Sequence, residues 1–486
     1  MLIAVIPMID IEQTKAHIAT VLSKVDGIEL RLDYVSVINI KEIAEIRKLI
    51  FLPVIFTLRK VTQGGHYQQN EQQRLQNLLN LCSLHPEYID IEYDVDRDFA
   101  RDLKQKYPQI KIICSYHDFH KTPHNLAEIL NHMRADCYDY YKLVTMANST
   151  LDALNMLYFV QQQKIQQPEL QLSAMCMGKA GECTRILAPI IGSAMCYAIF
   201  NEKNQTAFGQ IPIDDLLSIY CFKKLNKDTK IYALLGEPVA HSIGHLVHNR
   251  TFSLINVNAI YIKLAVNEKE LPKCLPLFLL LPFMGFSVTM PLKEIMFSRL
   301  NVADRATQKI QACNTVLIKN KKFVGYNSDG KAAIQILGHL QPLNQQTILI
   351  LGAGGTARAI AYEAVQRGAQ VTIVNRTYTK AQQLAKEFHC FSAEPKDLPQ
   401  LLTENNTTVI NTLPAMAYQE KTMQDLLMRC SFEHQYVMDV VYQPEATLFL
   451  NYARKTAKKI VDGYAMYMQQ ALLQIHYWFQ IRNKSN

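Results

Sequence analysis

The chain has 486 residues, which is too long for one hydrophobic core and predicts two large domains or three smaller ones. Apolar residues make up 49% of it and charged residues 19%, a composition typical of compact globular proteins and not of disordered chains. The formal net charge of +8 is spread along the chain without a block of basic residues interleaved with aromatics, so nucleic-acid binding is not expected.

The cysteines and apolar segments predict a cytoplasmic protein. Eleven cysteines occur without a C-x-x-C pair, a pattern typical of free thiols in a reducing compartment and not of disulfides or a zinc site. Met1–Pro7 lacks the basic region and cleavage site of a signal peptide and is predicted to be a core strand. Leu275–Leu292 is the most apolar segment, but its three prolines predict a helix end, a turn and a buried strand. We therefore expect no membrane association and no metal.

Short apolar segments recur through the first half at an average spacing of roughly 27 residues, about one βα unit each. Helical periodicity in Gln72–Leu84, Leu126–Arg134 and Leu151–Gln162 predicts helices between them. Eight such units over residues 1–222 predict an α/β fold, a (β/α)₈ TIM barrel. The predicted strands are Leu2–Ile6, Gly27–Leu32, Pro53–Leu58, Tyr88–Glu92, Ile110–Ser115, Tyr138–Val144, Glu169–Met175 and Ile190–Ala198.

Charged and polar residues lie in or just after the carboxyl ends of six predicted strands, where such barrels place their chemistry. One strand-end charge is typical of a loop, but the coincidence over six strands predicts a site. The three arginines among them are candidates for binding a carboxylate and hydroxyls. The residues are Glu29, Arg31, Arg59, Glu92, His117, Lys142 and Arg185.

Lys142 and His117 suggest the chemistry of this site. Lys142 lies near the end of its predicted strand, where partial desolvation favours a neutral, nucleophilic amine. Such an amine can form an imine with a ketone, and the imine is an electron sink for removing a neighbouring proton. His117 is on the preceding strand, and its ordinary pKa suits moving that proton and delivering it to a leaving hydroxyl. Either residue alone is commonly a surface or loop residue.

The second half begins after the charged segment 223–230, which is a predicted linker. A strand at Ile231–Leu235 follows, and strands and helices alternate again. The strand Thr347–Leu351, a Gly-x-Gly-Gly-x-Ala turn, a helix to Arg367 and the strand Gln370–Val374 form a predicted dinucleotide-binding βαβ unit. The glycines let the backbone approach a pyrophosphate, and the helix start supplies oriented N–H groups. The expected contacts are Gly352, Gly354, Gly355, Thr356 and Ala357.

The residues after the second strand of this unit predict the cofactor. An NAD-binding protein carries an acidic residue there, whereas this chain has Asn375, Arg376 and Thr377. The planar fork of an arginine suits the oxygens of a 2′-phosphate. We therefore expect NADP(H). A lysine at the end of another apolar segment, Lys293, suggests a second active site in this half.

Residues 1–222 resemble the type I 3-dehydroquinate dehydratases. The resemblance implies that Lys142 is the Schiff-base lysine and His117 the general acid and base. It also implies that Glu29, Arg31, Arg59, Arg185, Thr206 and Gln210 line the substrate site. The matching segments are Glu29-Leu-Arg-Leu-Asp33, Thr57-Leu-Arg59 before Gly64-Gly65, Ser115-Tyr-His-Asp-Phe119, Lys142, Met177-Gly178 with Arg185, and Phe208-Gly-Gln210.

Two residues depart from the pattern of that family. Gln63 stands where a glutamate commonly orients the histidine, and Thr206 stands where serine is common. An amide can hydrogen-bond but cannot stabilise an imidazolium by charge, so the first departure affects the pKa of His117 and hence the pH optimum.

The second half resembles shikimate dehydrogenase over about 250 residues. The resemblance implies a substrate domain at 231–335, completed by 464–486, and a Rossmann-like NADP-binding domain at 336–463. It implies Lys293 as proton donor paired with Asp329, because reduction of a ketone needs a proton at the new hydroxyl. Further implied contacts are Ser242, Thr289, Asn314, Tyr442 and Gln470 for shikimate, and Gly463 for the cofactor. The matching segments are Gly236–Ser242 with His248-Asn249, Ser287–Lys293, Ala312–Thr315, Gly325–Gly330, Asp439–Tyr442 and Gly463–Gln470.

The opening of this module departs from its family. Ser242-Ile-Gly-His245 replaces the usual Ser-x-Ser-Pro, which removes one hydroxyl from the carboxylate contact. Gly244 widens the pocket, so quinate competes with shikimate as the expected substrate. His245 either replaces the lost contact or faces solvent at a helix start.

Together the two resemblances imply a bifunctional enzyme of the shikimate pathway, which leads to chorismate and the aromatic amino acids. The barrel would dehydrate 3-dehydroquinate to 3-dehydroshikimate, and the second module would reduce that product with NADPH. Two alternatives stay open at this point: a quinate/shikimate dehydrogenase variant, and a protein in which one module serves only as a binding domain.

Overall fold

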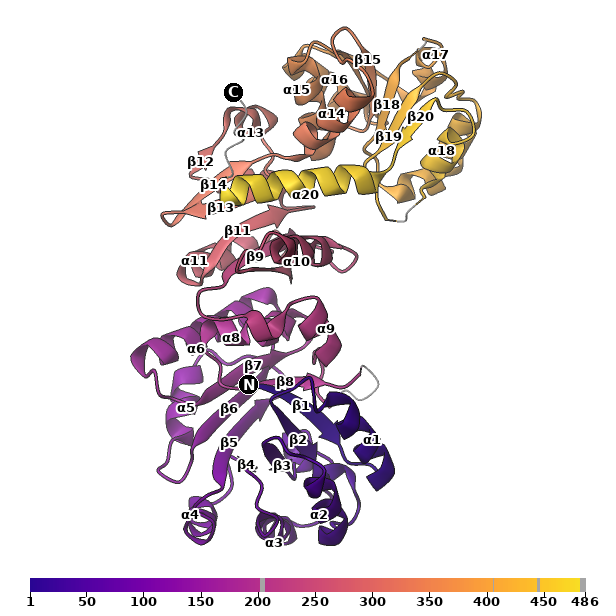
Figure 1. Ribbon diagram of the computed structural model, residues 1–486. Coiled ribbons are helices and arrows are strands. Elements are labelled where there is room, and N and C mark those ends of the chain that lie inside the picture. The colour runs from indigo at the N-terminus through magenta and orange to yellow at the C-terminus, as the bar shows by residue number, and fades with distance from the viewer. Residues whose placement is uncertain (202–205, 405, 444–445, 481–486) are drawn as a thin grey trace. The chain divides into compact units, whose positions relative to one another are not determined.

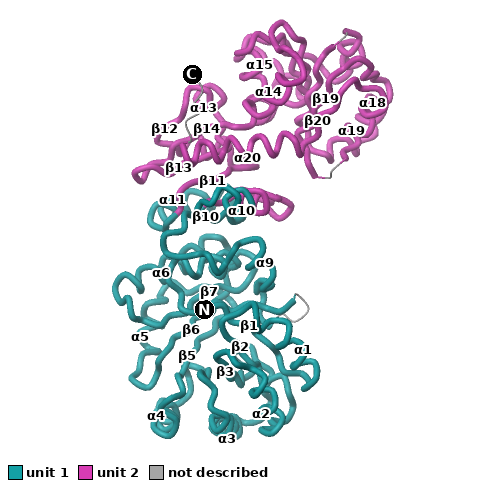
Figure 2. Tube along the Cα trace, viewed as in Figure 1, with its two compact units in different colours: residues 1–231, 249–282 teal, residues 232–248, 283–486 magenta. Residues whose placement is uncertain are grey.

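A computed structural model describes residues 1–201, 206–404, 406–443 and 446–480. The chain divides into two compact units (Figure 2). Unit 1 comprises residues 1–231 and 249–282, and unit 2 comprises residues 232–248 and 283–486.

Unit 1 contains the predicted (β/α)₈ barrel, which is confirmed (Figure 1). Strands β1 to β7 are parallel neighbours in chain order, and β8 pairs with β1. The Ala194 N–H donates to the Leu172 carbonyl at 2.8 Å and so joins the segment before β8 to β7. The strands are β1 (Leu2–Pro7), β2 (Gly27–Arg31), β3 (Val54–Thr57), β4 (Tyr88–Glu92), β5 (Lys111–Asp118), β6 (Tyr140–Met146), β7 (Leu172–Met177) and β8 (Cys196–Ile199).

The strands β1 to β4, β7 and β8 are buried at every residue, as expected where a parallel sheet is covered on both faces. Five helices begin at a residue whose side chain accepts a backbone N–H of the first turn, which satisfies a donor that the helix itself cannot pair. These caps are Asp10, Asn39, Asn70, Asp96 and Ser149. The helices of the barrel are α1 (Ile11–Val21), α2 (Ile40–Lys48), α3 (Glu71–Cys82), α4 (Arg97–Lys106), α5 (Leu126–Met133), α6 (Thr150–Gln166), α7 (Glu182–Ile186), α8 (Ala188–Ile191) and α9 (Ile213–Ser218).

The last predicted strand, Ile190–Ala198, was wrong in its first half. Pro189 lies in the first turn of α8, and Gly192 ends that helix with a φ of 85°. A proline suits a helix start and a glycine its end, so residues 188–191 are helical and the strand begins at Cys196.

The rest of unit 1 contains β10 (Ala259–Ala265) and α11 (Leu271–Leu280). The apolar segment Leu275–Leu292 therefore covers the second half of α11 and continues through β11 (Phe283–Val288), in line with the predicted helix end, turn and buried strand. Among the residues that the structure describes, no helix is long and apolar enough to cross a membrane.

Unit 2 has two sheets. In the first, β9 (Lys230–Gly236), β11, β13 (Thr315–Lys319), β14 (Lys322–Tyr326) and β12 (Val302–Ala303) follow one another in this order. Residues 481–486, part of the segment predicted to complete this domain, lie outside the described residues. The helices associated with these strands are α10 (Gly244–Leu254), α12 (Lys293–Phe297), α13 (Arg305–Ile310), α14 (Asp329–Leu340) and α20 (Gly463–Phe479).

The second sheet of unit 2 is parallel and has the order β17-β16-β15-β18-β19-β20. The order reverses at β15, and such a switch point is where open α/β sheets bind nucleotides. The predicted βαβ unit is therefore confirmed as β15, α15 and β16. The elements are β15 (Thr347–Leu351), α15 (Gly355–Gln366), β16 (Gln370–Val374), α16 (Tyr378–Phe388), β17 (Phe391–Ala393), α17 (Leu398–Leu401), β18 (Thr408–Asn411), α18 (Lys421–Met428), β19 (Tyr436–Asp439), α19 (Leu448–Ala453) and β20 (Lys459–Val461).

An ion pair connects α3 to the barrel. The Arg74 guanidinium is fully buried, lies 2.8 Å from the Glu92 carboxylate at the end of β4, and donates to the Leu58 carbonyl at 2.9 Å. Removing one partner of a buried pair leaves the other charge without compensation.

We expect Arg74→Met to lower the free energy of unfolding of the barrel by about 3 kcal/mol, because Glu92 then keeps one described cationic partner, Arg59, in place of two. Hydrogen exchange of the slowest amides in β4 and α3 would measure the loss. Arg101→Met on α4 is the matched control, because Arg101 is half-exposed and paired with an exposed carboxylate, and it should change nothing measurable. Equal protection in the Arg74 variant and the wild type would contradict the role of this pair.

Candidate active sites

One cavity of unit 1 is lined by eight of the nine residues predicted for the barrel site, whereas Glu92 does not line it. The eight come from β2, β5 and β6, from the segment after β3, from α7 and from the segment after β8. Side chains that were not predicted also line it, among them Phe119, Val144, Met175, Met177 and Tyr197. The predicted eight are Glu29, Arg31, Arg59, His117, Lys142, Arg185, Thr206 and Gln210.

Lys142 is the third residue of β6 and not a strand-end residue, and only 5% of it is exposed. Its Nζ donates to the Glu29 carboxylate at 3.0 Å and to the Asp90 carboxylate at 3.2 Å. It also lies 3.9 Å from the centre of the Tyr197 ring on β8. The amine is thus held in one position by two neighbouring acceptors and an aromatic face.

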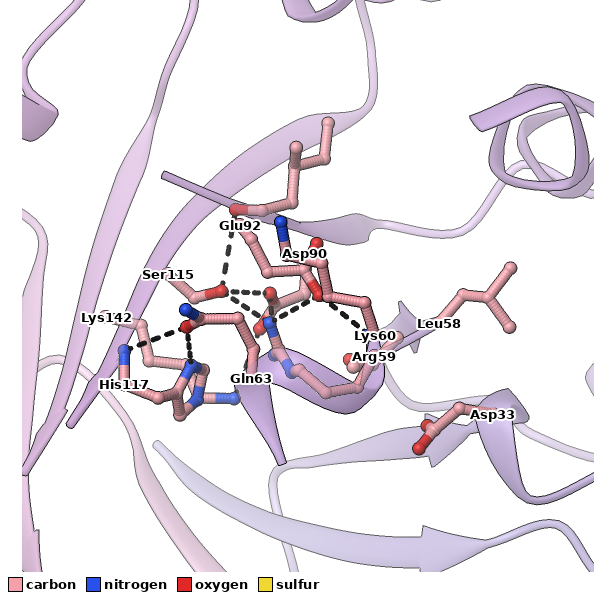
Figure 3. A network of polar contacts seen from close by, with 12 residues as sticks. Asp33, Leu58, Arg59, Lys60, Gln63, Asp90, Glu92, Ser115, His117 and Lys142 are labelled. Carbon is pink, nitrogen blue, oxygen red and sulfur yellow. Dashed lines mark hydrogen bonds and ion pairs between the residues drawn. The ribbon is translucent and has the colours of Figure 1, made fainter. Parts of the chain in front are cut away.

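Asp90 is a site residue that the sequence reasoning missed. Its carboxylate bridges Lys142 and Arg59, whose Nη2 lies 2.8 Å from it, and accepts the Ser115 hydroxyl at 2.6 Å (Figure 3). A signal for it exists in the sequence, because Asp90 and Glu92 alternate in an otherwise apolar strand. Period-two spacing places both carboxylates on the same face of β4.

The charges around Asp90 keep it ionised. Burial by itself would raise the pKa of this carboxyl, but the cations of Arg59 and Lys142 and the Ser115 hydroxyl hold the pKa well below its usual range. The carboxylate therefore stays a fixed negative charge beside the Lys142 amine at any physiological pH.

Gln63 orients His117. The Gln63 side-chain oxygen accepts the backbone N–H of His117 at 3.2 Å, and the same oxygen lies 3.2 Å from Nδ1 of the ring. Since an amide oxygen only accepts, Nδ1 carries the hydrogen and Nε2 of a neutral ring carries the lone pair. This leaves Nε2 as the proton acceptor of the site.

The His117 ring is held neutral. Burial lowers its pKa well below 6.5, the neighbouring cations Arg59, Lys142 and Arg31 lower it further, and Asp90 offsets only part of this. A carboxylate at position 63 would oppose this shift, whereas the amide of Gln63 does not. The ring is therefore a base that remains unprotonated at mildly acidic pH.

Arg185 is buried, and no carboxylate of the described residues pairs with it. Its guanidinium is 2% exposed and lies near the Met175 sulfur and the Tyr197 carbonyl, both at 3.2 Å. Arg31 differs, because its guanidinium donates two hydrogen bonds of 2.8 Å to the Asp33 carboxylate. Burial accordingly lowers the pKa of Arg185, and an anion in the cavity would compensate its charge.

Gln210 shapes the rim of the same cavity. Its side-chain oxygen accepts three hydrogen bonds, from the Thr206 N–H, the Thr206 hydroxyl and the Ala207 N–H, at 2.9 to 3.1 Å. Thr206 and Gln210 are therefore brought together, with the threonine hydroxyl engaged by the glutamine.

In unit 2, Lys293 begins α12, five residues after β11 ends. Its Nζ contacts Asp329 Oδ2 at 2.5 Å, and it lies 3.3 Å from the Thr356 hydroxyl. The Asn314 amide donates to the other Asp329 oxygen at 2.6 Å and to Gln470 at 3.4 Å. Four predicted residues thus form one hydrogen-bonded group, and Thr356 of the dinucleotide turn adjoins it.

The other predicted substrate residues of this module are Ser242, Tyr442 and Thr289, of which the first two contact each other. The Ser242 side chain hydrogen-bonds Tyr442, and the Gly244 N–H donates to the Ser242 hydroxyl at 3.1 Å. Thr289 follows β11, four residues before Lys293, and its backbone N–H donates to the Leu235 carbonyl at 2.9 Å. No hydrogen bond among the described side chains joins these residues to the Lys293 group.

The turn between β15 and α15 suits a dinucleotide. Gly352 has a φ of 113°, and a β-carbon on it would lie 2.4 Å from the Thr412 hydroxyl, so only glycine fits. A β-carbon on Gly354 would meet no atom within 4 Å, and no side chain caps α15. Unpaired N–H groups of the helix start therefore line a cavity, as a pyrophosphate requires. The cavity is lined by Gly354, Gly355, Thr356, Ala357, Lys293 and Thr412, among others.

The other predicted cofactor contacts, Gly352 and the residues described next, are not among the residues that line that cavity. Arg376 and its neighbours Asn375 and Thr377 follow β16, with the Asn375 amide donating to the Thr377 carbonyl at 3.0 Å. Gly463 is buried at the start of α20, where a β-carbon would lie 2.3 Å from the Val441 backbone. The absent side chain of Gly463 thus lets the α20 start pack against the segment that carries Tyr442. Across the described ranges, no cluster of His, Cys, Asp or Glu has the arrangement of a metal site.

Three families match successive parts of the chain. Type I 3-dehydroquinase matches residues 3–227, the shikimate dehydrogenase substrate binding domain matches 234–316, and shikimate / quinate 5-dehydrogenase matches 333–442. The shikimate biosynthesis protein AroDE of Chlamydia pneumoniae is 33% identical over 96% of this chain and 93% of its own. The chain belongs to the fused dehydroquinate dehydratase/shikimate dehydrogenase family.

Further relatives agree with this membership. The chloroplastic bifunctional 3-dehydroquinate dehydratase/shikimate dehydrogenase of Arabidopsis thaliana is 31% identical over 96% of this chain and 78% of its own. The shikimate dehydrogenase (NADP(+)) of Syntrophobacter fumaroxidans is 35% identical over 51% of this chain and 87% of its own. As a member of the fused family, the protein is a bifunctional enzyme of the shikimate pathway, a lyase joined to an NADP(H)-dependent oxidoreductase.

We expect Gln63→Glu to raise the pKa of His117 by about one unit or more, because a carboxylate at 3.2 Å from Nδ1 stabilises the imidazolium. A ¹³C NMR titration of the histidine rings, with the His117 signal assigned through His117→Asn, would measure it. Gln76→Glu on the exposed face of α3 adds the same charge elsewhere and should leave the titration unchanged. An unchanged His117 pKa in Gln63→Glu would show that Gln63 does not control it.

Proposed function

We propose that the barrel site converts 3-dehydroquinate to 3-dehydroshikimate through an imine on Lys142. The neutral amine attacks the substrate ketone, and loss of water from the adduct leaves a C=N bond that withdraws electrons. The Glu29 carboxylate, 3.0 Å from Nζ, is at hand as an acceptor for the ammonium proton. Hydrolysis of the imine after the elimination returns the free lysine.

His117 is proposed to move the proton of the elimination. Nε2 of the neutral ring takes a proton from the carbon next to the imine and then gives it to the departing hydroxyl, which leaves as water. The neutral ring and the Nδ1–H tautomer that Gln63 imposes support this assignment.

The observation that carries the proposal is that Arg185 has no carboxylate partner within the part of the chain that the structure describes. The other cationic side chains that line this cavity, Arg31, Arg59 and Lys142, each have a carboxylate partner of the protein. Arg185 would bind the carboxylate of the substrate. The negative charge of that carboxylate would offset the free-energy cost of burying the guanidinium. Glu29, Arg31, Arg59, Thr206 and Gln210 are then left to position the substrate hydroxyls.

For the second site we propose that Lys293 delivers the proton to the new hydroxyl when 3-dehydroshikimate is reduced. Asp329 orients the amine, and Asn314 in turn orients Asp329. Bound NADPH supplies the hydride. The α15 turn would hold its pyrophosphate, Arg376 with Asn375 and Thr377 its 2′-phosphate, and Gly463 would approach its nicotinamide end.

We propose two sets of contacts with shikimate, one to its carboxylate and one to its ring hydroxyls. Ser242 and Tyr442 would bind the carboxylate, and Thr289, Asn314 and Gln470 the ring hydroxyls. Quinate remains the second candidate substrate, because glycine at 244 leaves no side chain beside Ser242. We also propose the domain boundaries given above, and a reducing, cytoplasmic location, which the eleven unpaired cysteines support.

We expect Lys142→Arg to abolish borohydride trapping of 3-dehydroquinate on the protein and to lower the dehydratase kcat by at least about 10³-fold, because a guanidinium cannot form the imine. Mass spectrometry of the reduced adduct is the measurement. Lys179→Arg, an exposed lysine paired with Glu182, is the control. Trapping at another residue in the variant would refute the assignment, and shikimate oxidation should be unaffected in both.

We expect Lys293→Met to lower the kcat of shikimate oxidation by about 10²–10⁴-fold with a smaller change in KM, since the proton acceptor for the reverse reaction is lost. Lys331→Met, two residues beyond Asp329 and stacked near Tyr477, is the matched control. The same assay run with shikimate and NADP⁺ against quinate and NAD⁺ settles the substrate. Faster turnover of the second pair would overturn both the shikimate assignment and the role of Arg376.

A further inference from the structure

Arg376, the arginine that follows β16, forms an ion pair with a carboxylate of the protein, that of Glu420. Arg376 Nη1 lies 2.9 and 3.1 Å from the two oxygens of Glu420. The two side chains are 78% and 51% exposed, so both are open to solvent and to a ligand. Glu420 comes from a distant part of the sequence, immediately before α18.

The helix that follows Arg376 adds no second negative charge beside this pair. The first turn of α16, which begins directly after Thr377, carries no acidic residue. The side chain of Glu420 does not cap α18, so its ion pair with Arg376 is the polar contact described for it. The carboxylate is therefore not required to hold its own helix.

The pair opposes the binding of a phosphate at the same arginine. A phosphate monoester carries close to two negative charges at neutral pH and binds a guanidinium best through two parallel hydrogen bonds. Glu420 accepts the hydrogen bonds of Arg376 Nη1. Its negative charge also repels a phosphate that approaches the other N–H donors of the same guanidinium. A 2′-hydroxyl carries no charge and meets no such opposition.

We propose that Glu420 is a specificity-determining residue, which neutralises Arg376 in the cofactor-free protein and so weakens binding of the 2′-phosphate of NADP(H) without affecting the rest of the dinucleotide. This rests on the proposed contact between Arg376 and the 2′-phosphate. The preference for NADP(H) over NAD(H) is consequently smaller than Arg376 alone would give.

The opposite possibility is that Glu420 anchors Arg376 in a conformation that favours the phosphate. The two roles predict opposite effects of the same substitution on the affinity for the phosphate. Competition predicts that Glu420→Gln strengthens phosphate binding, whereas anchoring predicts that it weakens binding.

Titration calorimetry of the full chain with 2′,5′-ADP and with 5′-AMP tests the proposal. We expect Glu420→Gln to bind 2′,5′-ADP about two- to fivefold more tightly at low salt, with the gain shrinking as ionic strength rises. Binding of 5′-AMP should not change. Glu433→Gln, an exposed carboxylate elsewhere in the same sheet domain, gives the same charge change and should have no effect.

The double variant Arg376→Ala/Glu420→Gln distinguishes an error in the role of Glu420 from an error in the assignment of Arg376 to the 2′-phosphate. The gain should vanish in the Arg376→Ala background. An unchanged or weaker affinity of Glu420→Gln, an equal gain for 5′-AMP, or a gain that persists without Arg376 would each overturn the role of Glu420. If Arg376→Ala itself binds 2′,5′-ADP as tightly as the wild type, the assignment of Arg376 to the 2′-phosphate fails instead.

Discussion

The barrel depends on a line of alternating charges that crosses its interior. Lys142 contacts Asp90, Asp90 contacts Arg59, Arg59 contacts Glu92, and Glu92 contacts Arg74 on the outer helix α3. Each buried charge is acceptable only because its neighbour has the opposite sign. The position of the reactive amine is thereby tied to the packing of a helix on the far side of the β-sheet.

The second site is built with less burial and fewer charges. Lys293 and Asp329 form a single pair, and neutral amides and hydroxyls from Asn314, Thr356 and Gln470 surround it. A lysine that becomes covalently attached needs a fixed attack geometry, whereas one that only passes a proton needs a short contact and a partner. Lys142 contacts two carboxylates and Lys293 contacts one, which agrees with the different roles proposed for the two amines.

The eight barrel strands could be predicted because a parallel strand covered on both faces has a nearly continuous apolar sequence. The strand at Ile190–Ala198 was wrong in its first half, since a short apolar run has no periodicity to distinguish a buried helix from a strand. The residues of the barrel cavity could be predicted from family motifs, some of which also lie at strand ends. Asp90 was missed because it lies inside a strand, and the pairing of Arg376 with Glu420 because a contact between distant segments leaves no trace in either local pattern.

The burial of Arg185 has a consequence for the free protein. Among the described residues no carboxylate compensates this cation, and a buried charge without compensation lowers the stability of the empty barrel. A ligand that brings a carboxylate removes this cost at the moment it binds, and by mass action it shifts the population toward the folded barrel. The supply of metabolite would then set not only how fast the enzyme turns over but also how long each molecule of it survives proteolysis.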